Sequence, residues 1–182
     1  MKKTNLFLIL LLSAIVLYPK NTIKIGAYAG YFRSNDSLFT DIYKGEDVIY
    51  GLKLGIRVWN NLSVWVSGYQ FKQNGETTEL NDSTTLQLNP IHLSLRYTFK
   101  LGAIKPYLEG GYSYIHYKET SDIGDSSGNG SGYSIDAGLE IQLSSHFMID
   151  LGAKYTDCKV QTNGEDIQLG GAQAGLAFLV VF

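Results

Sequence analysis

Cysteine is scarce in this sequence, and its scarcity excludes internal disulfides as a source of stability. Cys158 is the single cysteine, so no internal disulfide framework can form, and no cysteine follows the N-terminal apolar segment to carry a lipid anchor. We expect no special role for Cys158. Proline is also scarce, with 3 residues, whereas Gly and Tyr are frequent, with 20 and 13. This composition favours strands and turns over helices.

Basic clusters are missing as well. The formal net charge is -2, and no basic patch or stripe of interleaved basic and aromatic residues occurs, which argues against nucleic acid as a partner. The segment 121–132 is rich in Ser, Asp and Gly and holds Asp122, Asp125 and Asn129, but these lack the spacing and the closing Glu of a calcium loop. We predict a flexible, solvated loop there, and we expect one domain with no cofactor and no metal site.

The sequence lacks an apolar run long enough for a membrane-spanning helix. The longest run, residues 6–17, has about 12 residues, whereas a helix needs about 20 to cross the ~30 Å of hydrocarbon in a bilayer. Two lysines precede this run, as in a secretory signal peptide. We predict that residues 1–21 form an export signal, cleaved between Ala14 and Thr22; an uncleaved N-terminal anchor is the alternative.

After this leader, apolar residues recur at every second position, which is the period of a strand and not of a helix. The clearest case is 50–58, where Tyr, Leu, Leu, Ile and Val alternate with Gly, Lys, Gly and Arg. The predicted strands are about 23–33, 50–58, 62–72, 91–99, 106–118, 133–143, 147–155 and 167–182. Leu86 and Leu88 are out of phase with the strand that follows them, so we predict a kink or bulge at Pro90, and another bulge after Gly68.

Short and long connections alternate between these strands. Three are short, at 60–61, 100–105 and 144–146, and four are longer. The first suits a two-residue hairpin turn, because Asn tolerates the positive φ that such a turn requires. Short turns at one rim and longer loops at the other are typical of outer-membrane barrels. The pattern therefore predicts an all-β, eight-stranded antiparallel up-and-down transmembrane β-barrel. A soluble barrel or sandwich is the alternative, because alternation alone does not decide which face points inward.

Charged residues on the less apolar strand faces favour the membrane barrel. Measured from the short turns they lie in two layers, and over the second to seventh strands four are basic and four are acidic. This balance is expected where charges neutralise one another in a narrow interior, since buried ions are retained only when they are paired. Arg96 and Glu109 lie at matching depth on neighbouring strands, as do Asp136 and Lys154. The predicted interior charge network comprises Lys53, Arg57, Arg96, Glu109, Asp136, Glu140, Asp150 and Lys154.

Aromatic residues lie at two levels along the strands, as expected for the two interfaces of a membrane. The level near the short turns comprises Trp59, Phe99, Tyr107, Phe147 and Phe182. The level toward the loops comprises Tyr31, Tyr50, Tyr69, Tyr114, Tyr133 and Tyr155. These two girdles support an arrangement with lipid on the outside of the barrel.

The last strand ends in Phe182, with Val180 and Phe178 before it at alternate positions. This ending resembles the C-terminal signal that the barrel-assembly machinery of bacterial outer membranes recognises. Across 22–182 the chain resembles the small eight-stranded outer-membrane proteins, a family that includes the OmpA transmembrane domain, OmpX, Ail and the opacity adhesins.

That resemblance implies the outer membrane of a Gram-negative bacterium, with outer-membrane lipid and lipopolysaccharide as neighbours. It implies an interior filled by side chains and a structural, adhesive or protective role, with an extracellular ligand held by the loops. No periplasmic tethering domain is expected after Phe182.

Two other functions stay open at this point. One is a narrow channel for small solutes, which the balanced interior charges oppose. The other is lipid A modification, because His92 and Ser94 resemble the His-x-Ser element of the lipid A deacylase PagL, with Glu109 or Glu140 as a third member. A serine nucleophile needs a base within hydrogen-bond reach and a carboxylate that orients this base. Both residues share the predicted inward face of Arg96, where an acyl chain cannot reach, so we expect no catalytic residues and no enzyme activity.

Overall fold

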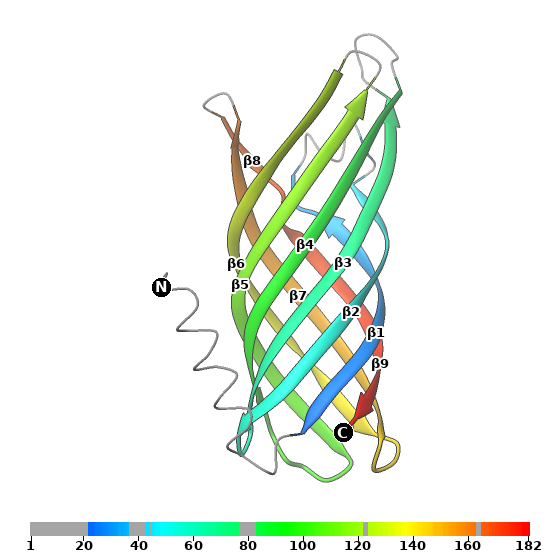
Figure 1. Cartoon of the computed structure of the whole chain (residues 1–182), viewed down its shortest axis with the longest axis vertical. Coiled ribbons are helices and arrows are strands. Elements are labelled where there is room, and N and C mark those ends of the chain that lie inside the picture. Colours follow the sequence, from blue (N-terminus) through cyan, green and yellow to red (C-terminus); the bar gives the residue numbers. More distant parts are fainter. Residues whose placement is uncertain (1–21, 37–42, 44, 77–82, 122–123, 163–164) are drawn as a thin grey trace, which may run out of the picture.

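The computed structural model describes residues 22–36, 43, 45–76, 83–121, 124–162 and 165–182 (Figure 1). The predicted export signal lies outside the described residues. The strands are β1 (Ile23–Ser34), β2 (Glu46–Trp59), β3 (Leu62–Glu76), β4 (Ser83–Thr98), β5 (Ile104–Ser121), β6 (Gly124–Gln142), β7 (Phe147–Thr162), β8 (Glu165–Gln168) and β9 (Gly171–Val181). Within this part of the chain, no helix is both long enough and apolar enough to cross a membrane.

The strands form one closed antiparallel sheet. Consecutive strands pair from β1 through β7, and β9 pairs with both β7 and β1. The short β8 pairs with β7 in the register that β9 continues, since Lys159 faces Gln168 and Thr156 faces Gly171. β8 and β9 are therefore two parts of one eighth strand, separated by two residues. The predicted eight-stranded antiparallel up-and-down barrel is confirmed.

In the half of the barrel near the short turns, apolar side chains cover the outside. Leu52 and Ile135 are 68% and 60% exposed, whereas Arg96 and His92 are 0% exposed in the interior. Successive side chains of a strand point to opposite faces, so one regular alternation produces both surfaces. An apolar outer surface around a polar interior is the reverse of a soluble barrel, and it suits surrounding hydrocarbon.

The three short turns lie at the same end of the barrel as the C-terminus (Figure 1); this end is called the short-turn end below. Asn60 has a φ of 31° in the two-residue turn between β2 and β3, as the sequence predicts. A register shift between Arg57 and Trp59 marks a bulge beside this turn. Gly102, with a φ of 87°, serves the connection between β4 and β5.

The bulges predicted after Gly68 and at Pro90 are wrong. The register of β3 against β4 is the same on both sides of Gly68, and β4 stays paired with β5 through Pro90. Leu86 and Leu88 are only 4% and 2% exposed, and they point inward as His92 does. The apolar pattern changes phase there because the interior changes from polar to apolar, while the strand itself stays regular.

The flexible loop predicted for 121–132 is also wrong over the residues described. β5 continues to Ser121 and β6 begins at Gly124, with Tyr117 facing Gly128 in the ladder. A Cβ at Gly128 would lie 2.6 Å from the Tyr117 ring, so glycine lets β6 pass close to this inward aromatic side chain. β3, β4 and β7 likewise extend beyond their predicted bounds at this end, which is called the loop end below (Figure 1).

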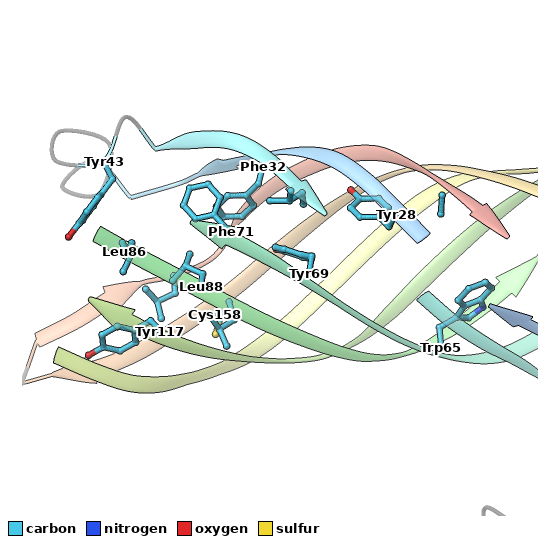
Figure 2. Close-up of a cluster of buried hydrophobic side chains, with 14 of the residues drawn as sticks. Tyr28, Phe32, Tyr43, Trp65, Tyr69, Phe71, Leu86, Leu88, Tyr117 and Cys158 are labelled. Carbon is cyan, nitrogen blue, oxygen red and sulfur yellow. The ribbon is translucent and has the colours of Figure 1, made fainter. Parts of the chain in front are cut away.

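The extended strands of the loop end enclose a hydrophobic cluster, called the apolar core below. The buried hydrophobic cluster of the barrel continues toward the short-turn end with Tyr28, Trp65, Met148, Ala177 and Leu179, and the name apolar core is kept for its members at the loop end. These are Phe32, Tyr43, Ile49, Tyr69, Phe71, Leu86, Leu88, Ile115, Tyr117, Cys158, Val160 and Leu169. Figure 2 shows the labelled side chains of the apolar core, such as Phe71 and Leu88, gathered at one end of the barrel, with Trp65 well apart from them. Phe32 and Phe71 meet edge to face with ring centroids 5.3 Å apart. Cys158 is 0% exposed within this cluster and contributes to its packing.

Tyr43 closes the apolar core from the connection between β1 and β2. Its hydroxyl lies 3.0 Å from Thr84 Oγ1 and donates a hydrogen bond to Glu119, so it joins β4 and β5. Burial raises the pKa of this hydroxyl far above its ordinary value, and the hydrogen bond to Glu119 acts in the same direction. The hydroxyl therefore stays protonated and remains a donor to Glu119.

Candidate functional site

Arg96 is the centre of the polar interior. It faces Glu109 directly across β4 and β5, and both its Nε and its Nη2 lie 2.7 Å from Glu109 Oε2. Its Nη1 lies 3.0 Å from Glu140 and 3.1 Å from Asp150, which project from β6 and β7. One guanidinium therefore contacts three carboxylates from three strands. Arginine suits this position because its planar group presents several donors in fixed directions.

Two aromatic rings enclose the same guanidinium. The Arg96 Cζ atom lies 4.0 Å from the ring centroid of Trp65 and 3.6 Å from that of Tyr107. Ring faces attract cations, and the attraction is stronger where water is excluded. Tyr107 also donates hydrogen bonds of 2.8 Å to Asp150 and 3.2 Å to Asp136, so it links the cation to the surrounding acids.

Three lysines complete this arrangement, which is called the ionic layer below. Lys24 Nζ lies 2.5 Å from Glu140, and Lys53 Nζ lies 2.8 Å from Asp150. Lys154 Nζ lies 3.9 Å from both Glu109 and Asp136. The ionic layer consists of Lys24, Lys53, Arg96, Lys154, Glu109, Asp136, Glu140 and Asp150. Its four cations face four carboxylates, and such mutual pairing is what allows ions to stay buried.

The structure brings together seven of the eight residues predicted for the interior network. Arg57 is the exception: it is partly exposed, nearer the short-turn end, and forms no ion pair within the described residues. Lys24 takes the fourth cationic place. Sequence reasoning missed it because charges were counted only from the second strand onward, although Lys24 lies on the same face of its strand as Tyr28.

The aromatic girdles need a correction at two positions. Tyr107 and Tyr69, predicted to face lipid, are 2% and 9% exposed and point inward. The other nine predicted girdle residues are exposed on the outside, at two levels. At the short-turn level Phe147 and Phe178 stack with ring centroids 5.5 Å apart.

The C-terminal residues lie beside the first strand. Phe182 donates a backbone hydrogen bond of 2.9 Å to Ile23, and Val180 faces Ile25 across β9 and β1. The Phe182 side chain is 71% exposed and Phe178 is 47% exposed, both on the outer surface.

His92 and Ser94 do not form a catalytic pair. Ser94 Oγ donates a 2.6 Å hydrogen bond to Glu109, whereas His92 Nδ1 lies 2.6 Å from Ser113 Oγ. Both residues are buried, at 0% and 4% exposure, and His92 stacks on the ring of Tyr69. Ser94 thus lacks an imidazole base among the described residues, and a carboxylate that already binds Arg96 holds its hydroxyl.

Two cavities border Lys154 of the ionic layer. The larger, of about 760 Å³, is also lined by Glu109 and Asp136 and by outward-facing side chains such as Leu108 and Ile135. The smaller, next to Lys53 and Lys154, has a volume of about 10 Å³, which is close to the space of one water molecule. Within the described part of the chain, no group of three or more His, Cys, Asp or Glu is placed to hold a metal ion. The interior carboxylates face cations of the protein itself.

The two ends of the barrel differ sharply in charge. The sequence segments 33–47, 72–85, 117–128 and 157–168, whose described residues lie at the loop end, hold 13 of the 17 acidic residues and 5 of the 15 basic ones. The segments 57–62, 98–106 and 142–147, which form the short turns, hold Arg57, Lys100 and Lys105 and no Asp or Glu. The remaining four carboxylates are those of the ionic layer.

Solved structures share this fold at low sequence identity. The outer membrane protein OprG of Pseudomonas aeruginosa aligns with a TM-score of 0.71 at 16% identity, over 89% of this chain and 96% of its own. Neisserial surface protein A aligns with a TM-score of 0.63 at 18% identity, over 89% of this chain and 96% of its own. Ail, the attachment invasion locus protein of Yersinia pestis, aligns with a TM-score of 0.54 at 16% identity, over 87% of this chain and 97% of its own. No curated protein sequence matches the chain.

A protein family matches almost the whole sequence. The family described as outer membrane protein beta-barrel domain covers residues 7–178. The match agrees with the closed eight-stranded sheet and with its apolar outer surface, and the resemblance to the small eight-stranded outer-membrane proteins is confirmed. The chain therefore belongs to the outer membrane protein beta-barrel domain family.

Proposed function

We propose that this protein is a closed, non-enzymatic barrel in the outer membrane of a Gram-negative bacterium, and that its loop end binds a partner outside the cell. The observation that carries the proposal is the filled interior. The ionic layer occupies one half and the apolar core occupies the other, so the exposed surface of the loop end is the part of the molecule available to a partner outside the cell.

The charge of the loop end indicates the chemistry of the partner. An excess of 13 acidic over 5 basic residues in the four loop-end segments creates a negative potential, which attracts cationic surfaces and repels anionic ones. Ail has the same fold, and a structure of it contains the heparin analogue sucrose octasulfate, a polyanion. The acidic loop end of the present chain favours a basic partner instead, so we propose adhesion to, or shielding against, cationic proteins.

Retention of cells on charged beads tests this proposal. Cells displaying the wild-type protein are expected to adhere to polylysine beads and not to polyglutamate beads, above the level of cells without it. The triple variant Glu46→Gln, Asp47→Asn, Asp125→Asn should lose several-fold in retention, because it removes negative charge at the loop end. The double variant Lys72→Gln, Lys118→Gln is the control and should adhere at least as well as the wild type. Equal adhesion of the acidic-site variant and the wild type would refute this role.

A narrow channel is the second candidate, and conductance separates it from the proposal. Because the ionic layer and the apolar core block the passage through the barrel, the purified protein is expected to add no discrete conductance steps to a planar lipid bilayer. Reproducible steps that change size in Lys53 or Lys154 variants would establish a channel through the ionic layer.

Lipid A deacylation is disfavoured by the same geometry. Ser94 is bound to Glu109 inside the barrel, away from any acyl chain. Mass spectrometry of lipid A from cells that express the protein should show no loss of an acyl chain. Loss of one chain that disappears in Ser94→Ala would overturn this view.

We also propose that Phe182, with Val180 and Phe178, is the signal that the barrel-assembly machinery recognises, and that lipopolysaccharide and outer-membrane lipid contact the apolar outer surface. Deleting Phe182 should reduce the amount of folded protein in membranes, measured as the fraction that changes gel mobility on boiling. Trp59→Ala is the matched control, since this aromatic residue at the same end is 75% exposed, against 71% for Phe182. Equal losses in both variants would contradict a signal at the C-terminus.

A further inference from the structure

The short-turn end contains a second polar feature that the proposed function does not use. A cavity of about 390 Å³ opens between the short turns, and its lining includes Lys24, Arg57, Lys100, Lys105 and Glu140. Pockets for small molecules commonly have volumes of about 300 to 1,000 Å³. Near the short turns, therefore, the barrel has room for a small solute.

The charges that line this cavity are unbalanced. Glu140 is the single carboxylate of the lining, and it is already bound by Lys24 at 2.5 Å and by Arg96 at 3.0 Å. The Lys24–Glu140 pair therefore forms a neutral floor. Three further cations, Arg57, Lys100 and Lys105, remain around the mouth of the cavity.

These three cations have no acidic partner among the residues that the structure describes. Lys100 Nζ donates to Asn60 Oδ1 at 2.6 Å, and Lys105 Nζ donates to Gln142 Oε1 at 2.6 Å, so both lysines are held by neutral amides. Arg57 is partly buried on the wall and has no carboxylate within ion-pair distance. The short-turn segments contain no Asp or Glu that could approach them.

Comparison with the ionic layer shows that the short-turn cavity lacks carboxylates to pair with these three cations. In the ionic layer, each cation has a carboxylate of the protein within 4 Å. At the short-turn end the protein assembles three cations around a cavity and supplies no compensating anion. We propose that this cavity is a binding site for the phosphate groups of a small anionic ligand, with Arg57 as the bidentate anchor on the wall and Lys100 and Lys105 at the rim. Because short turns of outer-membrane barrels face the periplasm, the ligand enters from that side.

Calorimetric titration with inorganic pyrophosphate tests the site, using the full-length barrel folded in an uncharged detergent. Wild type is expected to bind one pyrophosphate saturably. Arg57→Gln should weaken binding by about tenfold or more, because it removes a charge-assisted bidentate contact. Lys100→Gln should weaken binding by a smaller factor. Boiling-dependent gel mobility shows that each variant has folded.

Arg33→Gln is the matched control, since it removes the same charge by the same substitution on an exposed residue at the opposite end of the barrel. It should leave pyrophosphate affinity unchanged. Absence of saturable binding to wild type, or equal weakening by Arg33→Gln and Arg57→Gln, would overturn the proposal, because both results indicate general attraction between charges only.

A second arm identifies the source of the phosphate. The titration is repeated in phosphatidylcholine nanodiscs with and without phosphatidylglycerol. If anionic lipid weakens pyrophosphate binding to wild type and not the residual binding to Arg57→Gln, lipid headgroups reach the site. If anionic lipid has no effect, the site takes a soluble phosphate compound. Both results support a phosphate site at Arg57.

Discussion

The same strands bury opposite kinds of side chain in the two halves of this barrel: polar ones near the short turns and apolar ones near the loop end. Near the short turns, β4 directs Arg96 and Ser94 inward and Leu93 outward. Toward the loop end the same strand directs Leu88 inward and leaves Gln87 partly exposed on the outside. The pairing of β4 with β5 continues without a shift across this change.

The contrast teaches that the surroundings, and not strand geometry, set the chemistry of each face. Where hydrocarbon surrounds the sheet, apolar side chains belong outside, and the narrow interior is left for ions that pair with one another. Where the strands project beyond the membrane into water, the usual order returns and a hydrophobic cluster fills the centre. β5 shows the same exchange, with Glu109 inside near the short turns and Tyr117 inside near the loop end.

The largest effect is expected from breaking the ionic layer. Glu109→Ala leaves the Arg96 guanidinium without one of its carboxylates, and removing one partner of a buried pair costs about 3 to 5 kcal/mol of unfolding free energy. The double variant with Arg96→Ala should cost less than the sum of the single variants. Urea unfolding in detergent measures this double-mutant cycle.

The control for that cycle lies at the loop end. Lys118 and Asp125 form an ion pair of 3.4 Å with side chains that are 52% and 56% exposed. Their coupling energy should be about 0 to 1 kcal/mol, because exposed pairs are screened by water. A coupling energy for Arg96 and Glu109 below about 1 kcal/mol would remove the energetic distinction between the two pairs.

The next largest effect is expected in the apolar core. Leu88→Ala should lower the unfolding free energy by about 2 to 5 kcal/mol, since it removes buried contacts and leaves a cavity. Leu93→Ala, the same substitution three residues beyond Pro90 on the outer face, should cost clearly less because lipid or detergent fills the space. Unfolding of both variants under the same conditions compares them, and equal costs would contradict a distinct core at the loop end.

Substitutions between apolar and polar residues on the outer face of β4 should locate where the surroundings of the barrel change from hydrocarbon to water. Leu93→Gln places an amide in hydrocarbon without a hydrogen-bond partner and should cost about 1 to 3 kcal/mol. Gln87 lies on the outer face of β4 toward the loop end, where water surrounds the strand. Gln87→Leu should therefore change the unfolding free energy by no more than about 0.5 kcal/mol. Unfolding in lipid bilayers checks the pair; a large cost for Gln87→Leu would move the boundary.

The smallest effect is expected at Arg57, which the sequence groups with the interior ions. Arg57→Gln should change the unfolding free energy by no more than about 0.5 kcal/mol, because no ion pair is lost within the described residues. Lys53→Gln should cost more, since Asp150 loses a cation at 2.8 Å. Equal losses in urea unfolding would show that Arg57 belongs to the ionic layer energetically.

Several features followed from local pattern alone. Period-two alternation identified the strands, because a strand must send successive side chains to opposite faces. Asn60 marked a two-residue turn because few residues tolerate its backbone conformation. The equal depth of Arg96 and Glu109 placed them on facing positions, since antiparallel pairing is symmetric about the turn between the strands.

Other features depended on where each strand meets its surroundings. Leu86 and Leu88 looked like a change of strand phase, because a sequence does not show that the solvent outside the sheet changes from hydrocarbon to water. The Ser-, Asp- and Gly-rich stretch of β6 looked like a loop, because its strand conformation comes from pairing with β5 and not from its own propensity. Barrel closure decided the partners of the ions: it brought Lys24 from the first strand to Glu140 on the sixth, and left Arg57 at the open end. The sequence by itself determined the strands and the balance of charge, whereas the closed sheet decided which charges meet, because only closure sets the distances across the interior.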